Sequence, residues 1–224
     1  EQCVILIGRL DTPSTSSVHM RAIQGLALLT LSLAFAIHAD PRRMGVEGAV
    51  IAKTEQAIKE IERVLFGGKI AEAEAQVLAA MDAARTELPE KHPLAIDLMA
   101  YLGEVRQQQG RFEESFALRS QEVALLKEVL GPEDPTTLGA TRTWITSMLL
   151  LGRNREAVDA YEALLAVQLR LLGEGSINVA ETRHDLATAQ FRSGLLSAGL
   201  RNSELAYHGK VAHYGERHGE TLLS

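Results

Sequence analysis

The sequence predicts an all-α solenoid built from antiparallel helix pairs. Glycines recur with a period of 42 positions, as from Gly68 to Gly110, and short sequence motifs repeat with the same period. Long segments between the glycines contain no proline. Because proline breaks a helix interior, such segments are free to be helical. Hydrophobic residues make up 46% of the 224 residues and aromatic residues only 4%, a composition that can bury a core and argues against wholesale disorder.

Two columns of glycine mark where the helices end. The first column lies inside each helix pair and consists of Gly68, Gly110, Gly152 and Gly194. The second column lies between pairs and consists of Gly131, Gly173 and Gly215. Glycine adopts positive φ without steric strain, so it ends a helix readily. The first column therefore predicts a tight turn within each pair, and we call the interval between its members the repeat period.

The amino-acid sequence around the glycines repeats as well. LGPEDPTTL (130–138) aligns with LGEGSINVA (172–180) and with YGERHGETL (214–222), while GRFEES (110–115) aligns with GRNREA (152–157). Four units follow from this alignment, at 49–90, 91–132, 133–174 and 175–216, and a fifth is expected to begin within 217–224. Residues 1–40 form a separate N-terminal segment.

Each unit is expected to contain two helices. The first helices are predicted at 51–66, 94–109, 136–151 and 178–193, and the second at 69–88, 112–130, 154–172 and 195–214. Thr136, Thr137 and Asn178 stand near the starts of first helices and are candidate N-caps. His92 lies in a linker, where a capping or turn role is expected.

An apolar run, AIQGLALLTLSLAFAI (22–37), occupies the N-terminal segment. Met20-Arg21 before it and small residues near its end are typical of a secretory signal peptide, which implies export to an envelope compartment such as the periplasm. One alternative is a membrane anchor, although the run is shorter than a comfortable span of roughly 20 residues. The other is a helix that packs on the following domain. If it is not a targeting signal, a cytoplasmic location is expected.

Composition and spacing argue against several other classes. The net charge of -6 disfavours a nucleic-acid partner. Cys3 is the single cysteine, so neither a disulfide framework nor a cysteine-based zinc site is expected. His208 and His213 are five residues apart, which does not suit two ligands on one helix face. No catalytic grouping has supporting context, so we expect no enzyme, no metal and no cofactor.

Small residues stand five positions after each turn glycine: Ala73, Ser115, Ala157 and Gly199. Eight positions before the turn stands a large residue followed by a small or apolar one, in Leu102-Gly103, Trp144-Ile145 and Leu186-Ala187. These columns resemble the tetratricopeptide repeat, and the long period resembles its kinesin-light-chain subtype. The resemblance covers about 49–224, with Glu60 breaking the large-residue column in the first unit.

The resemblance implies a right-handed superhelix whose first helices line a concave groove that binds a protein or peptide. The implied groove positions are Asp97, Tyr101, Glu104 and Gln108 in the second unit, Arg142, Thr143, Thr146 and Leu150 in the third, and Glu181, His184, Asp185, Thr188 and Arg192 in the fourth. Tyr101, Thr143 and Asp185 replace the asparagine that commonly binds the ligand backbone in this family. The mixed charges predict neither a strongly acidic nor a strongly basic ligand.

Two functions of different classes are therefore expected. The first is a protein-interaction scaffold, which would act in envelope assembly if the chain is exported. The second is the regulatory or sensory repeat region of a larger signalling enzyme, such as a kinase or a nucleotide-binding protein, because repeats of this subtype often sit beside such domains. The partner, its sequence and the oligomeric state are not predicted by these patterns.

Overall fold

The computed structural model describes residues 41–215, and the side chains from Gly48 onward. Within that part of the chain there are eight helices and no strand. The helices are α2 (Pro41–Phe66), α3 (Ile70–Glu87), α4 (Pro93–Gln108), α5 (Phe112–Val129), α6 (Pro135–Leu150), α7 (Asn154–Leu172), α8 (Ile177–Arg192) and α9 (Leu196–Tyr214).

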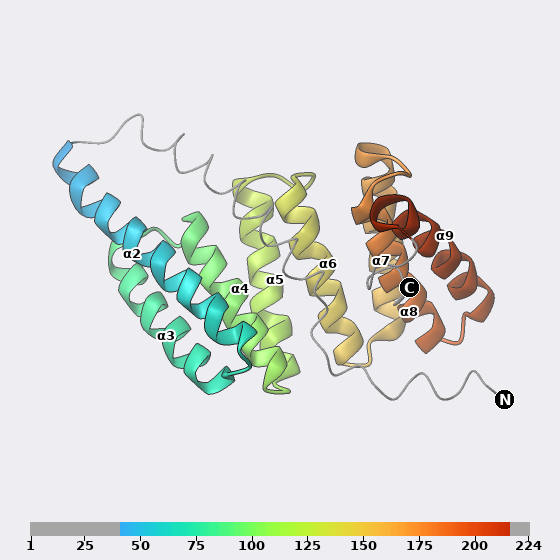
Figure 1. Ribbon diagram of the computed structural model, residues 1–224, viewed down its shortest axis with the longest axis horizontal. Helices are drawn as coiled ribbons and strands as arrows, with labels where there is room; N and C mark the ends of the chain where they lie inside the picture. The colour runs from blue at the N-terminus through green and yellow to red at the C-terminus, as the bar shows by residue number, and fades with distance from the viewer. Residues whose placement is uncertain (1–40, 216–224) are drawn as a thin grey trace.

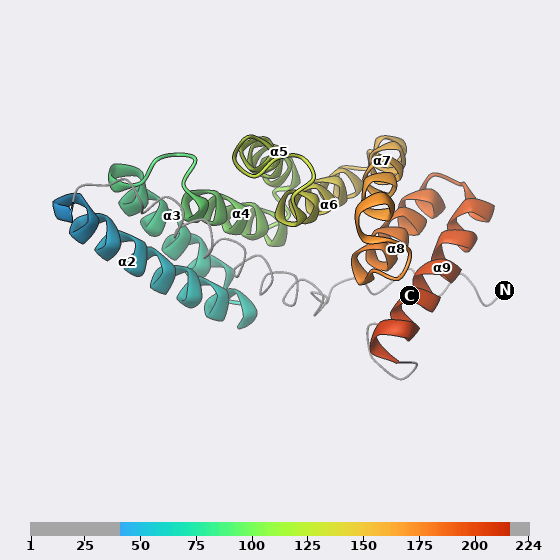
Figure 2. The same cartoon turned by 90° about the horizontal axis from the view of Figure 1, so that it is seen from above.

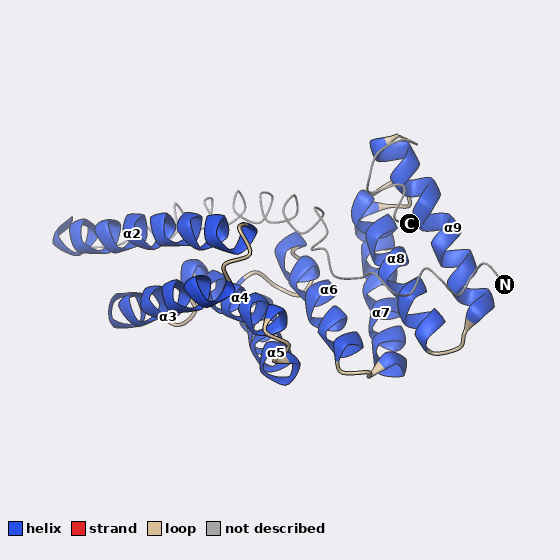
Figure 3. Cartoon of the chain, turned by 60° about the horizontal axis from the view of Figure 1, so that its bottom comes forward, coloured by secondary structure: helices blue, strands red, loops and turns tan. Residues whose placement is uncertain are grey.

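The helices follow one another along the long axis of the molecule, from α2 at one end to α9 at the other (Figure 1). Each helix packs against the next one in the chain, and α2 also contacts α4, as α6 contacts α8. Figure 2 shows the same stack from above, and Figure 3 shows that short loops join the helices. The arrangement is an α solenoid, which confirms the predicted fold class.

Seven helices begin and end within a few residues of the predicted positions, but α2 begins at Pro41, well before the expected start at 51. Proline suits this position, because its missing N–H is one that the first turn leaves unbonded in any case. The glycine columns explain the agreement elsewhere. All seven glycines of the two columns have positive φ, for example +71° at Gly68 and +93° at Gly131, and no other residue type between 41 and 215 does.

The expected N-caps were wrong at two of the first helices. Asp134 caps α6, its carboxylate accepting a 2.8 Å hydrogen bond from the backbone N–H of Thr136, so the threonines lie inside the helix. Ser176 precedes α8, and Asn178 falls in its first turn. The prediction for His92 is confirmed: it is the N-cap of α4, and its Nδ1 accepts from the N–H of Leu94 at 3.2 Å.

The column of small residues allows the two helices of a pair to approach closely. Ala73, Ser115 and Ala157 are completely buried, and a Cβ atom added to Gly199 would meet the Phe191 ring at 2.6 Å. Trp144 is half-buried and packs against two separate apolar clusters, one that contains Ile145 and Tyr161 and another that contains Ile96 and Val123. Trp144 thus fills space within its own helix pair and against the preceding pair, while the small residues allow the two helices of a pair to lie close together.

Two sequence-based predictions concern residues outside the described range. The apolar run at 22–37 lies outside the described residues, and so does the expected start of a fifth unit at 217–224. Among the described helices, none is both long and apolar enough to cross a membrane. The division into units at 49–90, 91–132, 133–174 and 175–216 stays a prediction.

Replacing Gly209 of α9 by alanine is expected to destabilise the protein. The added Cβ would lie 2.7 Å from the Cβ of Ala180, and the two cannot separate unless α8 and α9 move apart. Overpacking costs about 1–3 kcal/mol, which outweighs the gain in helix propensity of about 1 kcal/mol. The expected result is a thermal midpoint lower by about 2–4 °C, measured by circular dichroism.

Gly48→Ala in α2 is the matched control, because a Cβ at Gly48 has no atom within 4 Å. There the propensity gain stands alone, so the midpoint is expected to rise. A rise at Gly209 as well would contradict the close approach of α8 and α9.

Candidate protein-interaction site

Two of the four residues predicted on α4, Tyr101 and Glu104, bond to the helices on either side of it. The hydroxyl of Tyr101, 8% exposed, donates a hydrogen bond to Glu62 of α2. Glu104 pairs with Arg119 of α5 at 3.2 Å and accepts a 3.0 Å hydrogen bond from Gln108. Gln108 is exposed. Tyr101 and Glu104 therefore connect α4 to α2 and to α5.

Asp97 stands among carboxylates. Burial, reinforced by the negative charges of Glu122 and Glu62, raises the pKa of Asp97 from 3.8 to about 7. Arg119 lies 3.0 Å from Glu122 and 3.2 Å from Glu104, with its side chain 5% exposed. We call Glu62, Asp97, Glu104 and Glu122 the acidic cluster. Among residues 41–215, no group of three or more histidine, cysteine, aspartate or glutamate side chains is arranged to hold a metal ion.

The predicted residues of α6 and α8 meet through Arg142. Its guanidinium lies 2.5 Å from Glu181 and 3.5 Å from Asp185, and only 12% of its side chain is exposed. Burial by itself lowers the pKa of Arg142, but the charges of Asp185 and Glu181 outweigh it, so the pKa is raised overall. This trio forms a closed ion-paired group between the two helices.

The remaining predicted residues mainly bond to backbone. The hydroxyls of Thr143, Thr146 and Thr188 donate to carbonyl oxygens four residues earlier in their own helices, the last of these to His184. Thr146 also shares a 2.7 Å hydrogen bond with the hydroxyl of Tyr161. Arg192 donates to the carbonyl of Leu149 at 3.2 Å. The fold thus gathers Arg142, Glu181 and Asp185 into one group, which Thr146 joins only through the backbone carbonyl of Arg142.

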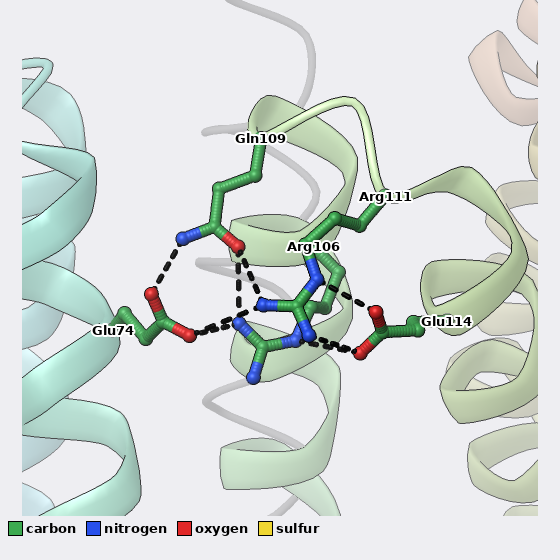
Figure 4. A network of polar contacts seen from close by, with 5 residues as sticks. All are labelled: Glu74, Arg106, Gln109, Arg111 and Glu114. Atoms are coloured by element: carbon green, nitrogen blue, oxygen red, sulfur yellow. Dashed lines mark hydrogen bonds and ion pairs between the residues drawn. The ribbon is translucent and has the colours of Figure 1, made fainter.

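A second polar network joins α3, α4 and α5 at the turn that follows α4 (Figure 4). Glu74 accepts hydrogen bonds from Arg106 and from Gln109, the latter at 2.6 Å. Arg111 lies 3.5 Å from Glu74 and 2.6 Å from Glu114. Sequence reasoning missed this network, because it concentrated on first helices and most of these side chains lie on or beside second helices.

One repeat period after this network, a different type of contact occupies the same positions. Phe116 and Arg153 stand one period after Glu74 and Arg111, and Arg153 lies over the Phe116 ring at 4.8 Å. An ion pair between one pair of units is thus replaced by a cation–π contact between the next. The same offset relates the Glu104–Arg119 pair to the Thr146–Tyr161 hydrogen bond.

Comparison with solved structures identifies the fold. A protein of Podosopora anserina described as a putative kinesin light chain with nearly identical TPR-like repeats superposes with a TM-score of 0.63, at 17% identity over 89% of this chain and 91% of that one. A single-residue variant of it gives 0.65 at 17% identity, over 89% and 90%. The chain has the tetratricopeptide-like repeat fold.

A third solved structure agrees. BtubC (BKLC) of P. vanneervenii matches with a TM-score of 0.58 and 16% identity over 73% of each chain. No family model and no curated protein matches the sequence. The resemblance to kinesin-light-chain-like repeats seen in the glycine columns is therefore confirmed at the level of the fold.

The correspondence between Glu104–Arg119 and Thr146–Tyr161 yields a coupling prediction. Arg119→Tyr alone removes the ion pairs of Arg119 with Glu104 and Glu122, which we expect to cost about 3 kcal/mol, as removal of one partner from a buried ion pair typically does. Adding Glu104→Thr and Glu122→Leu recreates the residues found one period later, Thr146 and Leu164. Urea unfolding should show that the triple variant recovers most of the loss; additive losses would contradict equivalent packing.

The raised pKa of Asp97 predicts a pH-dependent stability. Its folded pKa of about 7 exceeds the unfolded value of 3.8, so the folded state holds the proton more tightly. The stabilisation is full below the unfolded value and is lost as the pH rises from there through about 7. We expect the thermal midpoint of the unaltered chain to fall relative to that of Asp97→Asn between pH 4 and pH 8. Parallel pH profiles would contradict the burial of this carboxyl.

Proposed function

We propose that the chain is a protein-interaction scaffold that binds an extended or partly helical peptide along its first helices. Tetratricopeptide-like repeats generally mediate protein–protein interaction, because each helix pair buries one face on its neighbours and leaves another for a partner. The predicted groove residues on α4, α6 and α8 are mostly polar and lie on successive first helices. We infer no catalytic role, and we treat protein as the partner class.

The acidic cluster is the observation that carries the proposal further. Around α4, Glu104 and Glu122 pair with Arg119, and the negative charges of Glu122 and Glu62 act on Asp97. Arg142, in contrast, pairs with two carboxylates of its own, Glu181 and Asp185. A guest with a lysine or arginine opposite α4 would be attracted to the cluster and would keep Asp97 ionised.

Peptide display against the full chain, followed by measurement of Kd for the selected peptides, tests this proposal. We expect selected peptides to contain a basic residue, and Asp97→Asn to weaken their binding about tenfold, or about 1.4 kcal/mol. Binding by the unaltered chain should strengthen from pH 6 to pH 8 as Asp97 loses its proton, and this dependence should vanish in Asp97→Asn.

Asp159→Asn is the matched control. Asp159 is an exposed residue of the second helix α7, so this variant makes the same change in charge away from the first helices. Selected peptides that bind both variants as tightly as the unaltered chain would place the binding surface elsewhere.

A further inference from the structure

A small cleft lies where α6, α7 and α8 meet. Its volume is about 20 Å³, and its lining includes Leu138, Gly139 and Arg142 of α6, Gln168 and Leu172 of α7, and Asn178 of α8. Leu172 is exposed whereas Leu138 and Gln168 are buried, so the cleft leads from the surface into the junction of the three helices. One water needs roughly 10–15 Å³ of such space, so this cleft has room for a water or for one small polar group.

The side chain of Gln168 has an unmet hydrogen bond in this cleft. It is only 3% exposed, and its Oε1 is buried without a hydrogen-bond partner among the residues that the structure describes. A buried acceptor that has no donor is costly, because it has lost its water and gained nothing in return. An occupant that donates a hydrogen bond to Gln168 would therefore be bound favourably.

The cleft is particular to this unit of the repeat. One period before Gln168 stands Leu126, which is buried in an apolar cluster. One period before and after Gly139 stand Asp97 and Glu181. The third unit thus has a carboxamide where the second has an alkyl side chain, and a glycine where both neighbouring units have a carboxyl side chain. Its polar lining does not follow from the stacking of helix pairs in general.

The lining selects among the possible occupants by charge. A cation would lie against the guanidinium of Arg142, which lines the cleft, whereas Glu181 and Asp185 do not. An anion would meet a guanidinium that already pairs with those two carboxylates. A purely apolar group would leave Oε1 of Gln168 without a donor. A neutral group that both donates and accepts hydrogen bonds is the occupant that remains.

We propose that this cleft binds a neutral carboxamide, such as the side chain of an asparagine or glutamine in a partner peptide. Its N–H donates to Oε1 of Gln168, its oxygen accepts from the side-chain amide of Asn178, and its alkyl stem packs on Leu138 and Leu172. That the carboxamide belongs to a peptide rests on the proposed function, but the affinity of the cleft for the group does not.

Acetamide is a direct probe of this site, followed by amide NMR spectra of the full chain. We expect saturable shifts with a millimolar Kd at the backbone amides of Gly139 and Asn178 and at the side-chain amide of Gln168. Methylammonium chloride and sodium acetate should give no saturable shift at these groups. Gln168→Leu should weaken acetamide binding at least about tenfold, and it should fold, because Leu126 fills the same position one period earlier. Asn178→Ala, which keeps Gln168, should weaken it as well.

Gln121→Leu is the matched control, because Gln121 is an exposed glutamine of the second helix α5, and this variant should keep the acetamide response. The inference is overturned if acetamide gives no saturable shift, if all three probes give the same shift, or if Gln168→Leu responds like the unaltered chain. Peptides that bind a chain that does not bind acetamide would leave the scaffold and remove the site. Acetamide binding by a chain that selects no peptide would leave the site and remove the scaffold.

Discussion

At three successive junctions of this stack, the residue six positions after the turn glycine on a second helix contacts the next unit. Glu74 meets Arg106 and Arg111 of the next unit, Phe116 meets Trp144 and Arg153, and Val158 packs beside Leu186. The chemistry changes from ion pairs to ring contacts to aliphatic packing, while the geometry recurs with every period. Because each contact joins only neighbouring units, stability is expected to add up along the chain one interface at a time.

The interface residues occupy the same repeat positions in each unit but differ in type, so each unit fits best against its own neighbour. A charged residue in the place of Phe116 would lie half-buried beside Trp144, and an apolar one in the place of Glu74 would remove one of the two carboxylates that pair with Arg106. Ion pairs on the surface follow the same logic, since Lys91–Glu128 recurs one period later as Glu133–Arg170 with the signs exchanged. Such exposed pairs are individually weak, about 0–1 kcal/mol, but wrong pairings between units would set like charges together.

Much of the fold could be predicted from the sequence, because its strongest signals are local. A glycine with positive φ ends a helix wherever it stands, so Gly110 and Gly152 located the turns without any knowledge of packing. The cap at Asp134 was missed, since it depends on which of several adjacent polar residues the backbone selects. The start of α2 at Pro41 was missed because it lies before the first repeat unit, where the period gives no signal. The acidic cluster was missed because Glu62, Arg119 and Glu122 come from helices outside the groove positions that the resemblance implies.

Within residues 41–215 the molecule is a stack of interfaces between neighbouring helices, with polar side chains exposed on α2 and apolar side chains exposed on α9. Hydrogen exchange in low concentrations of denaturant, followed helix by helix, tests this claim most directly. We expect slow exchange in α4, α5, α6 and α7, which have units on both sides, and faster exchange towards α9. Equal protection in all the helices from α2 to α9, lost in one step, would contradict it.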